Sequence, residues 1–303
     1  MKKQNKTSTT LMLIISTLMI FNVLSSCQKK QDKYIGIQLW SVRDSMKTAP
    51  EKTLQQLGDI GYGFIEAAGY DNGKFYGMNP ADFKNLVESN GMEFLSSHTG
   101  HPLPDSSEWE ETMKWWDQCI KAHKKAGVKY IVQPSMGGSA YQSLENLEAY
   151  CDYFNAIGKK CNENEIRFGY HNHDKEFTQL EGKTIYDFML QNTDPEKVFF
   201  QMDLYWVVEG DAEPVDYFEK YPQRFELWHI KDEAELGASG KMDFESMFAK
   251  SDLAGMKYAI VEIEKYNYDP IKSAEISYDY LINADFTEQL FLLPENINIK
   301  PPR

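Results

Sequence analysis

The sequence predicts an α/β fold in which eight strand–helix units close into a parallel (β/α)8 barrel, the TIM-barrel architecture. From residue 34 onward, short β-branched or aromatic runs alternate eight times with amphipathic stretches. Metal-capable side chains also follow four successive runs, at gaps of about thirty residues, the length of one strand, one loop and one helix. Such side chains converge on one site only if the strands form a closed barrel.

The boundaries of the eight units follow from their sequence patterns. Strands are expected at residues 34–40, 63–67, 93–98, 130–134, 166–170, 198–203, 225–230 and 258–262. Helices are expected at residues 49–57, 80–89, 107–126, 144–161, 184–191, 214–220, 244–250 and 270–281. Ser107, with Glu110 three residues later, is typical of a capped helix start, and Gly127 of its end. A doubly wound sheet is the alternative, but its usual glycine-rich loop is absent from Ser41-Val42-Arg43-Asp44 after the first strand.

The N-terminal segment predicts export. Met1-Lys2-Lys3 is basic, residues 11–24 are apolar but short for a membrane span, and Leu24-Ser25-Ser26-Cys27 resembles a bacterial lipoprotein signal. We therefore expect residues 1–26 to be removed and Cys27 to be lipidated, with residues 27–33 as a tether. The protein would then be anchored to a bacterial membrane, on its periplasmic or cell-surface side. An uncleaved N-terminal anchor is the alternative.

Residues 34–303 are expected to form one barrel domain with a C-terminal tail. The tail starts at residue 284, and its apolar patch at residues 290–293 is expected to pack on the outside of the barrel. Cys119, Cys151 and Cys161 fall in helical stretches and are interpreted as small buried apolar residues. A disulfide between Cys151 and Cys161 is the alternative for these two residues.

The charge balance argues against a nucleic-acid partner. The chain has 32 basic and 46 acidic residues, a net charge of −14. Removal of the signal takes away Lys2, Lys3 and Lys6 and leaves 29 basic against 46 acidic residues, or −17. Such a surface repels phosphate backbones, and no basic stripe offsets it. The same field disfavours a highly anionic substrate.

The metal-capable side chains are a mixed set of imidazoles and carboxylates. They are His171, His173, Asp203, His229 and Glu262. Because side chains alternate along a strand, His171 and His173 share a face. The same holds for the pairs His229–Lys231 and Glu262–Glu264. Each pair would place one residue near an ion and the other nearer the mouth, where a substrate would sit.

Such a set suits a borderline divalent ion such as Mn, Co, Zn, Fe or Ni better than Ca, and Mg stays among the candidates. Four side chains leave an open coordination position, which is typical of a catalytic site. An ion that holds adjacent carbonyl and hydroxyl oxygens of a sugar acidifies the proton α to the carbonyl. A carboxylate or imidazole nearby can then move that proton.

Further polar or aromatic side chains at strand ends are candidates for substrate binding. They are Gln38, Trp40, Glu66, His98, Gln133, Trp206 and Glu264. Glu66 and His98 are the stronger candidates, because an ionisable group is disfavoured in a buried strand without a partner. Placement at the solvated rim is the alternative for both. Trp206 would form a sugar-facing wall, whereas Trp115 and Trp116 have helical spacing and are expected in the core.

Several motifs resemble one known family. They are Ile35 to Asp44 (IGIQLWSVRD), Gly169 to Phe177 (GYHNHDKEF), Leu227 to Asp232 (LWHIKD) and Val261-Glu262. They resemble the sugar phosphate isomerase/epimerase family of xylose isomerase-like TIM barrels, from about Tyr34 to Leu281. The resemblance implies a divalent ion held by side chains from strands five to eight. On this sequence these are His171 or His173, Asp203, His229 and Glu262.

This sequence departs from the family pattern at strand five. In the family's epimerases and ketose isomerases, that strand supplies a glutamate that works with the strand-eight glutamate as an acid/base pair. Here it offers histidines, which is similar to relatives that act on keto-inositols and 3-keto-glycosides. We hypothesise that Glu262, with His171, His173 or Glu176 opposite, moves the α-proton. Lys231 would steady the developing oxyanion.

The expected function is therefore a divalent-metal-dependent sugar isomerase or epimerase acting on a small carbohydrate. A 3-keto-sugar lyase or dehydratase is one alternative, and a non-catalytic sugar-binding lipoprotein is another. A nucleic-acid repair enzyme shares the superfamily, but the acidic balance and the export signal argue against it. The oligomeric state stays open.

Overall fold

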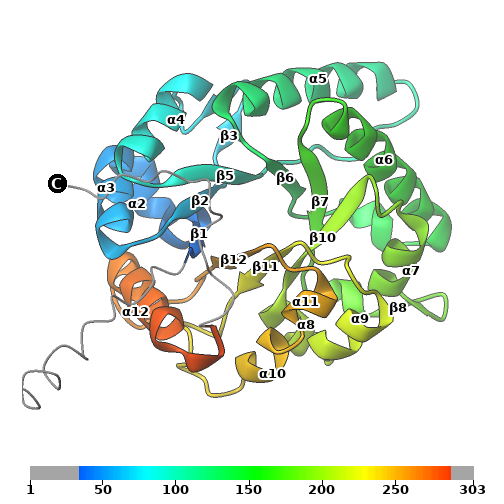
Figure 1. The fold of residues 1–303 in the computed structure, drawn as a ribbon. Coiled ribbons are helices and arrows are strands. Elements are labelled where there is room, and N and C mark those ends of the chain that lie inside the picture. The colour runs from blue at the N-terminus through cyan, green and yellow to red at the C-terminus, as the bar shows by residue number, and fades with distance from the viewer. Residues whose placement is uncertain (1–33, 288–303) are drawn as a thin grey trace, which may run out of the picture.

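The computed structural model describes residues 34–287, which form a closed barrel of eight parallel strands (Figure 1). The strands follow one another around the ring in chain order, so each βα unit lies beside the next. This confirms the predicted TIM barrel. The barrel strands are β1 (Gly36–Gln38), β2 (Phe64–Ala67), β5 (Glu93–His98), β6 (Tyr130–Gln133), β7 (Arg167–His171), β10 (Val198–Asp203), β11 (Leu227–Ile230) and β12 (Tyr258–Val261).

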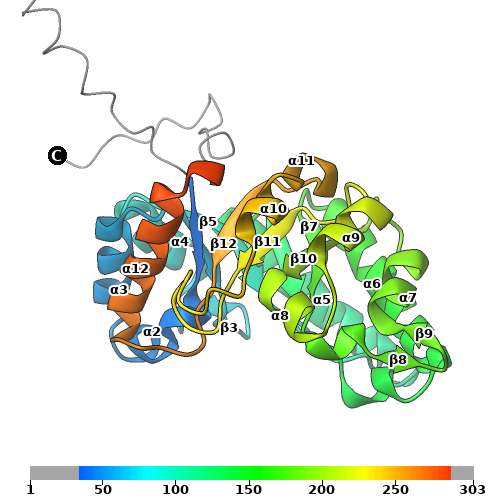
Figure 2. The same cartoon turned by 90° about the horizontal axis from the view of Figure 1, so that it is seen from below.

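Helices cover the outside of the barrel, and Figure 2 shows α2, α3 and α12 grouped at one side and α6 and α7 at the opposite side. The α-helices are α2 (Arg43–Thr48), α3 (Pro50–Ile60), α4 (Pro80–Ser89), α5 (Trp109–Ala126), α6 (Leu144–Asn162), α7 (Ile185–Asn192), α8 (Leu204–Glu209), α9 (Pro214–Lys220), α10 (Phe244–Phe248), α11 (Ser251–Ala254) and α12 (Pro270–Asn283). Contacts between α12 and α3 close the outer ring.

Short elements occupy several of the loops. They are the 3-10 helices η1 (Leu39–Val42), η2 (Gly138–Tyr141), η3 (Asp174–Phe177) and η4 (Asp285–Thr287), and the two-stranded hairpins β3 (Tyr70–Asp71) with β4 (Lys74–Phe75) and β8 (Gln179–Leu180) with β9 (Lys183–Thr184). The first hairpin follows β2 and the second follows β7, both at the C-terminal face of the barrel. None of the helices within residues 34–287 is long and apolar enough to cross a membrane.

The first unit differs from its prediction at the end of the strand. The Gln38 side chain accepts a hydrogen bond from the Trp40 N–H at 3.0 Å, which ends β1 and starts η1. Helix α2 follows where a loop was expected, and its buried Met46 fixes it on the core. Helix α5 also begins later than expected, because a turn bond from Glu108 N–H to the Asp105 carbonyl precedes it.

Aromatic side chains fill the N-terminal half of the barrel interior. The rings of Tyr34, Phe64, Tyr130, Phe199 and Tyr258 contact one another in tilted or edge-to-face pairs, with centroids between 4.9 and 6.3 Å apart. Val132 and Ile260, two residues after Tyr130 and Tyr258, belong to the same apolar cluster. Further along the strands the side chains are polar, with Glu66 and Gln201 two residues after Phe64 and Phe199, and Glu262 two residues after Ile260. The barrel therefore has an apolar lower part and a polar upper part at its C-terminal face.

A second apolar cluster joins the barrel to its helices and contains the three cysteines of the described chain, all free and buried. Trp116 is fully buried there, and Trp115 packs against the same core, as expected. The predicted signal segment with Cys27, the tether and the apolar patch at residues 290–293 lie outside the described residues.

Candidate metal centre and active site

Four of the five candidate metal ligands lie together at the C-terminal ends of β7, β10, β11 and β12. His171, Asp203, His229 and Glu262 are all buried, and each offers one ligand atom within 4.8 Å of the others. His171 and Asp203 are the last residues of their strands, and Glu262 follows β12 directly. Because these four strands are neighbours in the barrel, their ends converge on one point.

His173, the fifth candidate, lies above this cluster. Its ring centroid is 5.0 Å from that of His171, and it lines the cavity over the cluster. Asn172 points outward between them, and its side chain bonds the Asp203 backbone and the Tyr186 hydroxyl. His171 and His173 therefore lie on the same side of the chain, as expected. Of the two, His171 belongs to the cluster with Asp203, His229 and Glu262.

The residues of the cluster fit a divalent cation. Nδ1 of His171 and Oδ2 of Asp203 are buried, and neither has a hydrogen-bond partner within residues 34–287. Buried polar atoms are rarely left unpaired, so two such atoms in one cluster indicate a missing partner. Imidazole nitrogens together with carboxylate oxygens form the donor set typical of a divalent transition-metal ion.

Glu66 lies beneath the cluster and is fully buried. Its Oε1 accepts hydrogen bonds from Nε2 of His229 at 2.7 Å and from Nε2 of Gln38 at 2.8 Å. This leaves Nδ1 of His229 on the side of Glu262, 3.3 Å from Oε2. An imidazole held by a carboxylate at one nitrogen and free to bind at the other is common in metal sites.

The two buried histidines have opposite pKa shifts. Burial lowers the pKa of His171 well below its ordinary value, and the neighbouring His229 lowers it further, so its imidazole is neutral and can bind a cation. Burial also acts to lower the pKa of His229. The carboxylates of Glu262 and Glu66 outweigh it and raise this pKa to about 10. Without an ion, His229 is therefore held as an imidazolium between two carboxylates.

Lys231 is the other cation at the centre. Its Nζ is 3.2 Å from Oε2 of Glu262, 3.0 Å from Oε1 of Glu264 and 3.7 Å from Oδ2 of Asp203. It also lies 4.6 Å from the centroid of the Trp206 ring. Burial raises the pKa of Asp203 to about 7, against the opposing effect of Lys231. Burial also acts to raise the pKa of Glu262. The positive charges of Lys231 and His229 outweigh burial there and hold this pKa well below the usual range.

A cavity of about 380 Å³ opens above the cluster, a size suited to a small ligand. It is lined by Trp40, Ala68, His98, Pro134, Ser135, His171, His173, Glu262 and Glu264. Three of the expected substrate-binding residues, Trp40, His98 and Glu264, therefore face the space where a substrate would sit.

The other expected substrate-binding residues surround this cavity without lining it. Gln38 and Glu66 lie below it, bonded to each other. Gln133 is buried, and its Nε2 donates to the Ser135 carbonyl at 3.0 Å. The Trp206 ring lies beside His173, with centroids 5.8 Å apart.

Glu176 is buried and engaged at both carboxylate oxygens. Oε1 accepts from the hydroxyls of Tyr141 at 2.6 Å and Tyr170 at 2.7 Å, and Oε2 accepts from the His173 N–H at 2.8 Å. It does not line the cavity. We therefore revise its expected role from proton transfer to holding the backbone of His173.

Gln201 and Ser96 complete the polar network and were not among the expected site residues. Oε1 of Gln201 accepts from Nε2 of His98 at 2.6 Å, and its Nε2 donates to Glu66 at 2.8 Å. The Ser96 hydroxyl donates to the same carboxylate. Each lies two residues before a candidate, Asp203 and His98 respectively, so the period of two along a strand was the signal for both.

Comparison with known proteins identifies the family. The family model of the xylose isomerase-like TIM barrel matches residues 54–292, most of the chain. The protein therefore belongs to this family, in agreement with the closed barrel and with the resemblance of its motifs.

Its relatives include carbohydrate enzymes. Two solved structures of sugar phosphate isomerase/epimerases from Parabacteroides distasonis are similar to this chain, both with a TM-score of 0.79. One is 33% identical and covers 84% of this chain and 99% of its own; the other is 30% identical and covers 86% and 97%. An inosose dehydratase from Geobacillus kaustophilus is 24% identical over 196 residues, 60% of this chain. The matched part spans 61% of the length of that relative.

Proposed function

We propose that this protein is a divalent-metal-dependent sugar isomerase or epimerase that transfers a proton α to a carbonyl of a sugar or ketosugar. The observation that carries this proposal is a buried, metal-capable cluster at the floor of a cavity whose wall holds an imidazole and carboxylates. The two similar isomerase/epimerase structures support a carbohydrate substrate.

The cluster and its neighbours would divide the chemistry between them. A divalent ion bound by His171, Asp203, His229 and Glu262 would supply Lewis-acid polarisation of adjacent carbonyl and hydroxyl oxygens. Lys231 is held as an ammonium by the surrounding carboxylates, because they outweigh burial and raise its pKa. It can donate a hydrogen bond to an oxygen that gains negative charge as the proton leaves.

Two sides of the cavity carry groups that can move the proton. His173 lies beyond the end of β7, and burial lowers its pKa, so its imidazole is neutral and can accept a proton. Glu262 and Glu264 follow β12, which is separated from β7 by β10 and β11 in the ring. Groups on different sides can remove a proton from one face of a substrate and return it to the other, as an epimerase must.

A 3-keto-sugar lyase or dehydratase is the second candidate. The inosose dehydratase relative and the histidines at the end of β7 favour it. The same α-proton transfer would then be followed by loss of a β-substituent. A non-catalytic sugar-binding protein would keep carbohydrate binding with a metal-free centre.

Proton exchange in deuterated water tests the proposal. The metal-loaded protein is incubated with a panel of keto-sugars, with and without chelator, and deuterium at the α-carbon is measured by NMR. We expect exchange that the chelator abolishes. Loss of a leaving group together with exchange would favour the lyase. No exchange with any keto-sugar, while the metal is bound, would contradict proton-transfer chemistry.

We also propose that the protein is exported and anchored through lipidated Cys27, on the support of the N-terminal sequence pattern. A Cys27→Ser variant expressed in a Gram-negative host is expected to move from the membrane fraction to the soluble fraction or to remain as unprocessed precursor. A processed variant that still fractionates with the membrane would argue against the anchor.

A further inference from the structure

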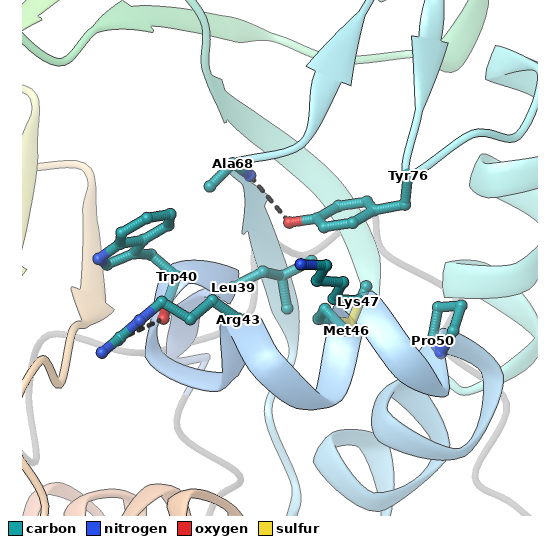
Figure 3. A pocket seen from close by; sticks show the side chains of 8 residues that line it. All are labelled: Leu39, Trp40, Arg43, Met46, Lys47, Pro50, Ala68 and Tyr76. Carbon is teal, nitrogen blue, oxygen red and sulfur yellow. Dashed lines mark hydrogen bonds between the residues drawn. The ribbon is translucent and has the colours of Figure 1, made fainter.

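A second cavity of about 310 Å³ lies next to the first at the C-terminal face of the barrel (Figure 3). The two cavities share Trp40 and Ala68, so a ligand could pass from one to the other along the Trp40 ring. The Trp40 side chain is available for this, since the residue is 47% exposed although its neighbours Leu39 and Ser41 are buried.

The lining of the second cavity is mainly apolar. Leu39 and Met46 form its floor, and Figure 3 shows Trp40 and Tyr76 on either side of it. The Tyr76 hydroxyl accepts a hydrogen bond from the Ala68 N–H at 3.0 Å, so this ring is held in place. Two rings above an apolar floor suit a flat apolar group rather than a second sugar, which would need several hydrogen-bond partners.

Two cations border this apolar space. Arg43 and Lys47 lie one turn apart on α2, on the same side of the helix. The Arg43 guanidinium is fixed, because it donates to the Trp40 carbonyl at 3.2 Å and to the Tyr266 hydroxyl at 2.6 Å. Lys47 is exposed and has no ion pair or hydrogen bond within residues 34–287. In a chain with a net charge of −14, this is a local surplus of positive charge.

We propose that the second cavity is a subsite for an aromatic group that carries an acidic substituent. The substrate would then be an aryl glycoside whose sugar ring carries a keto group, with that ring in the first cavity, the aromatic aglycone between Trp40 and Tyr76, and the anionic substituent near Lys47. Each cavity is at the lower end of the usual range for ligand pockets, about 300–1,000 Å³, and therefore holds one ring-sized group. Only the position of the sugar ring rests on the proposed function.

Direct binding tests this subsite without relying on catalysis. The probes are 4-carboxyphenyl, phenyl and methyl β-D-glucopyranoside, with free 4-hydroxybenzoate as a probe that has no sugar. Dissociation constants are measured by calorimetry, and saturation-transfer NMR shows whether the aryl protons contact the protein. The variants are Lys47→Glu and, as a matched control, Lys52→Glu, a lysine that is also exposed but does not line the cavity.

The expected order of affinity is 4-carboxyphenyl, then phenyl, then methyl glucoside. Lys47→Glu should weaken binding of 4-carboxyphenyl glucoside and of 4-hydroxybenzoate about threefold to tenfold, and Lys52→Glu should not. Equal affinity for the three glucosides, equal effects of both variants, or no binding of either acidic probe would overturn the subsite. Binding of these probes that depends on Lys47, together with no proton exchange on any keto-sugar, would support the subsite and contradict the proposed catalysis.

Discussion

Glu66 holds His229 from beneath the candidate metal centre, through a contact of 2.7 Å between Oε1 and Nε2. We expect Glu66→Gln to weaken the binding of Mn²⁺ about 10- to 100-fold, because an amide cannot orient the imidazole as a carboxylate does. Calorimetric titration of the metal-free protein measures the affinity. Glu93→Gln, at the opposite end of the barrel, is the control. Equal affinities in both variants would show that Glu66 does not position the ligand.

His173 lines the cavity but lies outside the four-residue cluster, so its contribution can be separated from metal binding. His173→Gln should retain the metal and lower the rate of α-proton exchange about 10²- to 10⁴-fold, the usual contribution of a general base. The measurement is deuterium incorporation in the metal-loaded variant. An exchange rate like that of the unmodified protein would assign proton transfer to Glu262 or Glu264 alone.

At the scale of single elements, β1 depends on a glycine that makes room for an aromatic ring. A Cβ at Gly36 would overlap the Phe64 ring, which fills the barrel interior. Gly36→Ala should therefore lower the free energy of unfolding by about 1–3 kcal/mol, the usual cost of overpacking. Gly138→Ala is the control, since a Cβ there meets nothing within 4 Å. Chemical denaturation measures both, and a Gly36→Ala variant as stable as the control would contradict this packing.

Helix α5 contains a buried histidine that should make stability depend on pH. Burial lowers the pKa of His123 to about 4, and its Nδ1–H donates to the Cys119 carbonyl at 2.8 Å. The unfolded chain, with an ordinary pKa of 6.5, binds this proton more readily. The stability due to neutral His123 is thus present above pH 6.5 and is lost as pH falls towards 4, by up to about 3 kcal/mol.

Denaturation of His123→Gln between pH 7 and pH 4 measures this effect. We expect the variant to lose less stability over this range than the unmodified protein does, because glutamine has no proton to bind. The same pH dependence in both proteins would show that other groups cause the loss.

The barrel and the cluster could be predicted because both depend on regular patterns. The eightfold alternation identified the strands, and the spacing of His171, Asp203, His229 and Glu262 placed them at neighbouring strand ends. The period of two along a strand paired His171 with His173, but it could not decide which of them lies deeper. That depends on where the strand ends relative to the other ligands, which only the assembled barrel shows.

Roles that depend on contacts between distant residues could not be predicted. Glu176 has the position of a residue at the mouth, yet the hydroxyls of Tyr141 and Tyr170 hold its carboxylate. Helix α2 looked like a loop, because its stability comes from packing of Met46 on the core rather than from a long periodic pattern. The second cavity is a consequence of this helix, since α2 supplies three of its lining residues.

At the scale of the whole molecule, the closed ring joins residues from strands more than ninety positions apart into one centre. His171 and Glu262 meet only because β7, β10, β11 and β12 are neighbours in the barrel. The central claim is therefore that these four strands together hold one divalent ion. This claim predicts that His171 and Glu262 bind the ion, whereas His173 and Glu264, which carry the same functional groups two positions further along, do not.

Metal content of purified variants tests this claim most directly. We expect His171→Ala and Glu262→Gln to lose the ion after gel filtration, as measured by plasma mass spectrometry. His173→Ala and Glu264→Gln, which remove the same functional groups two residues further along, should retain close to one ion per chain. Unchanged metal content in all four variants, or equal loss in the two pairs, would contradict the account.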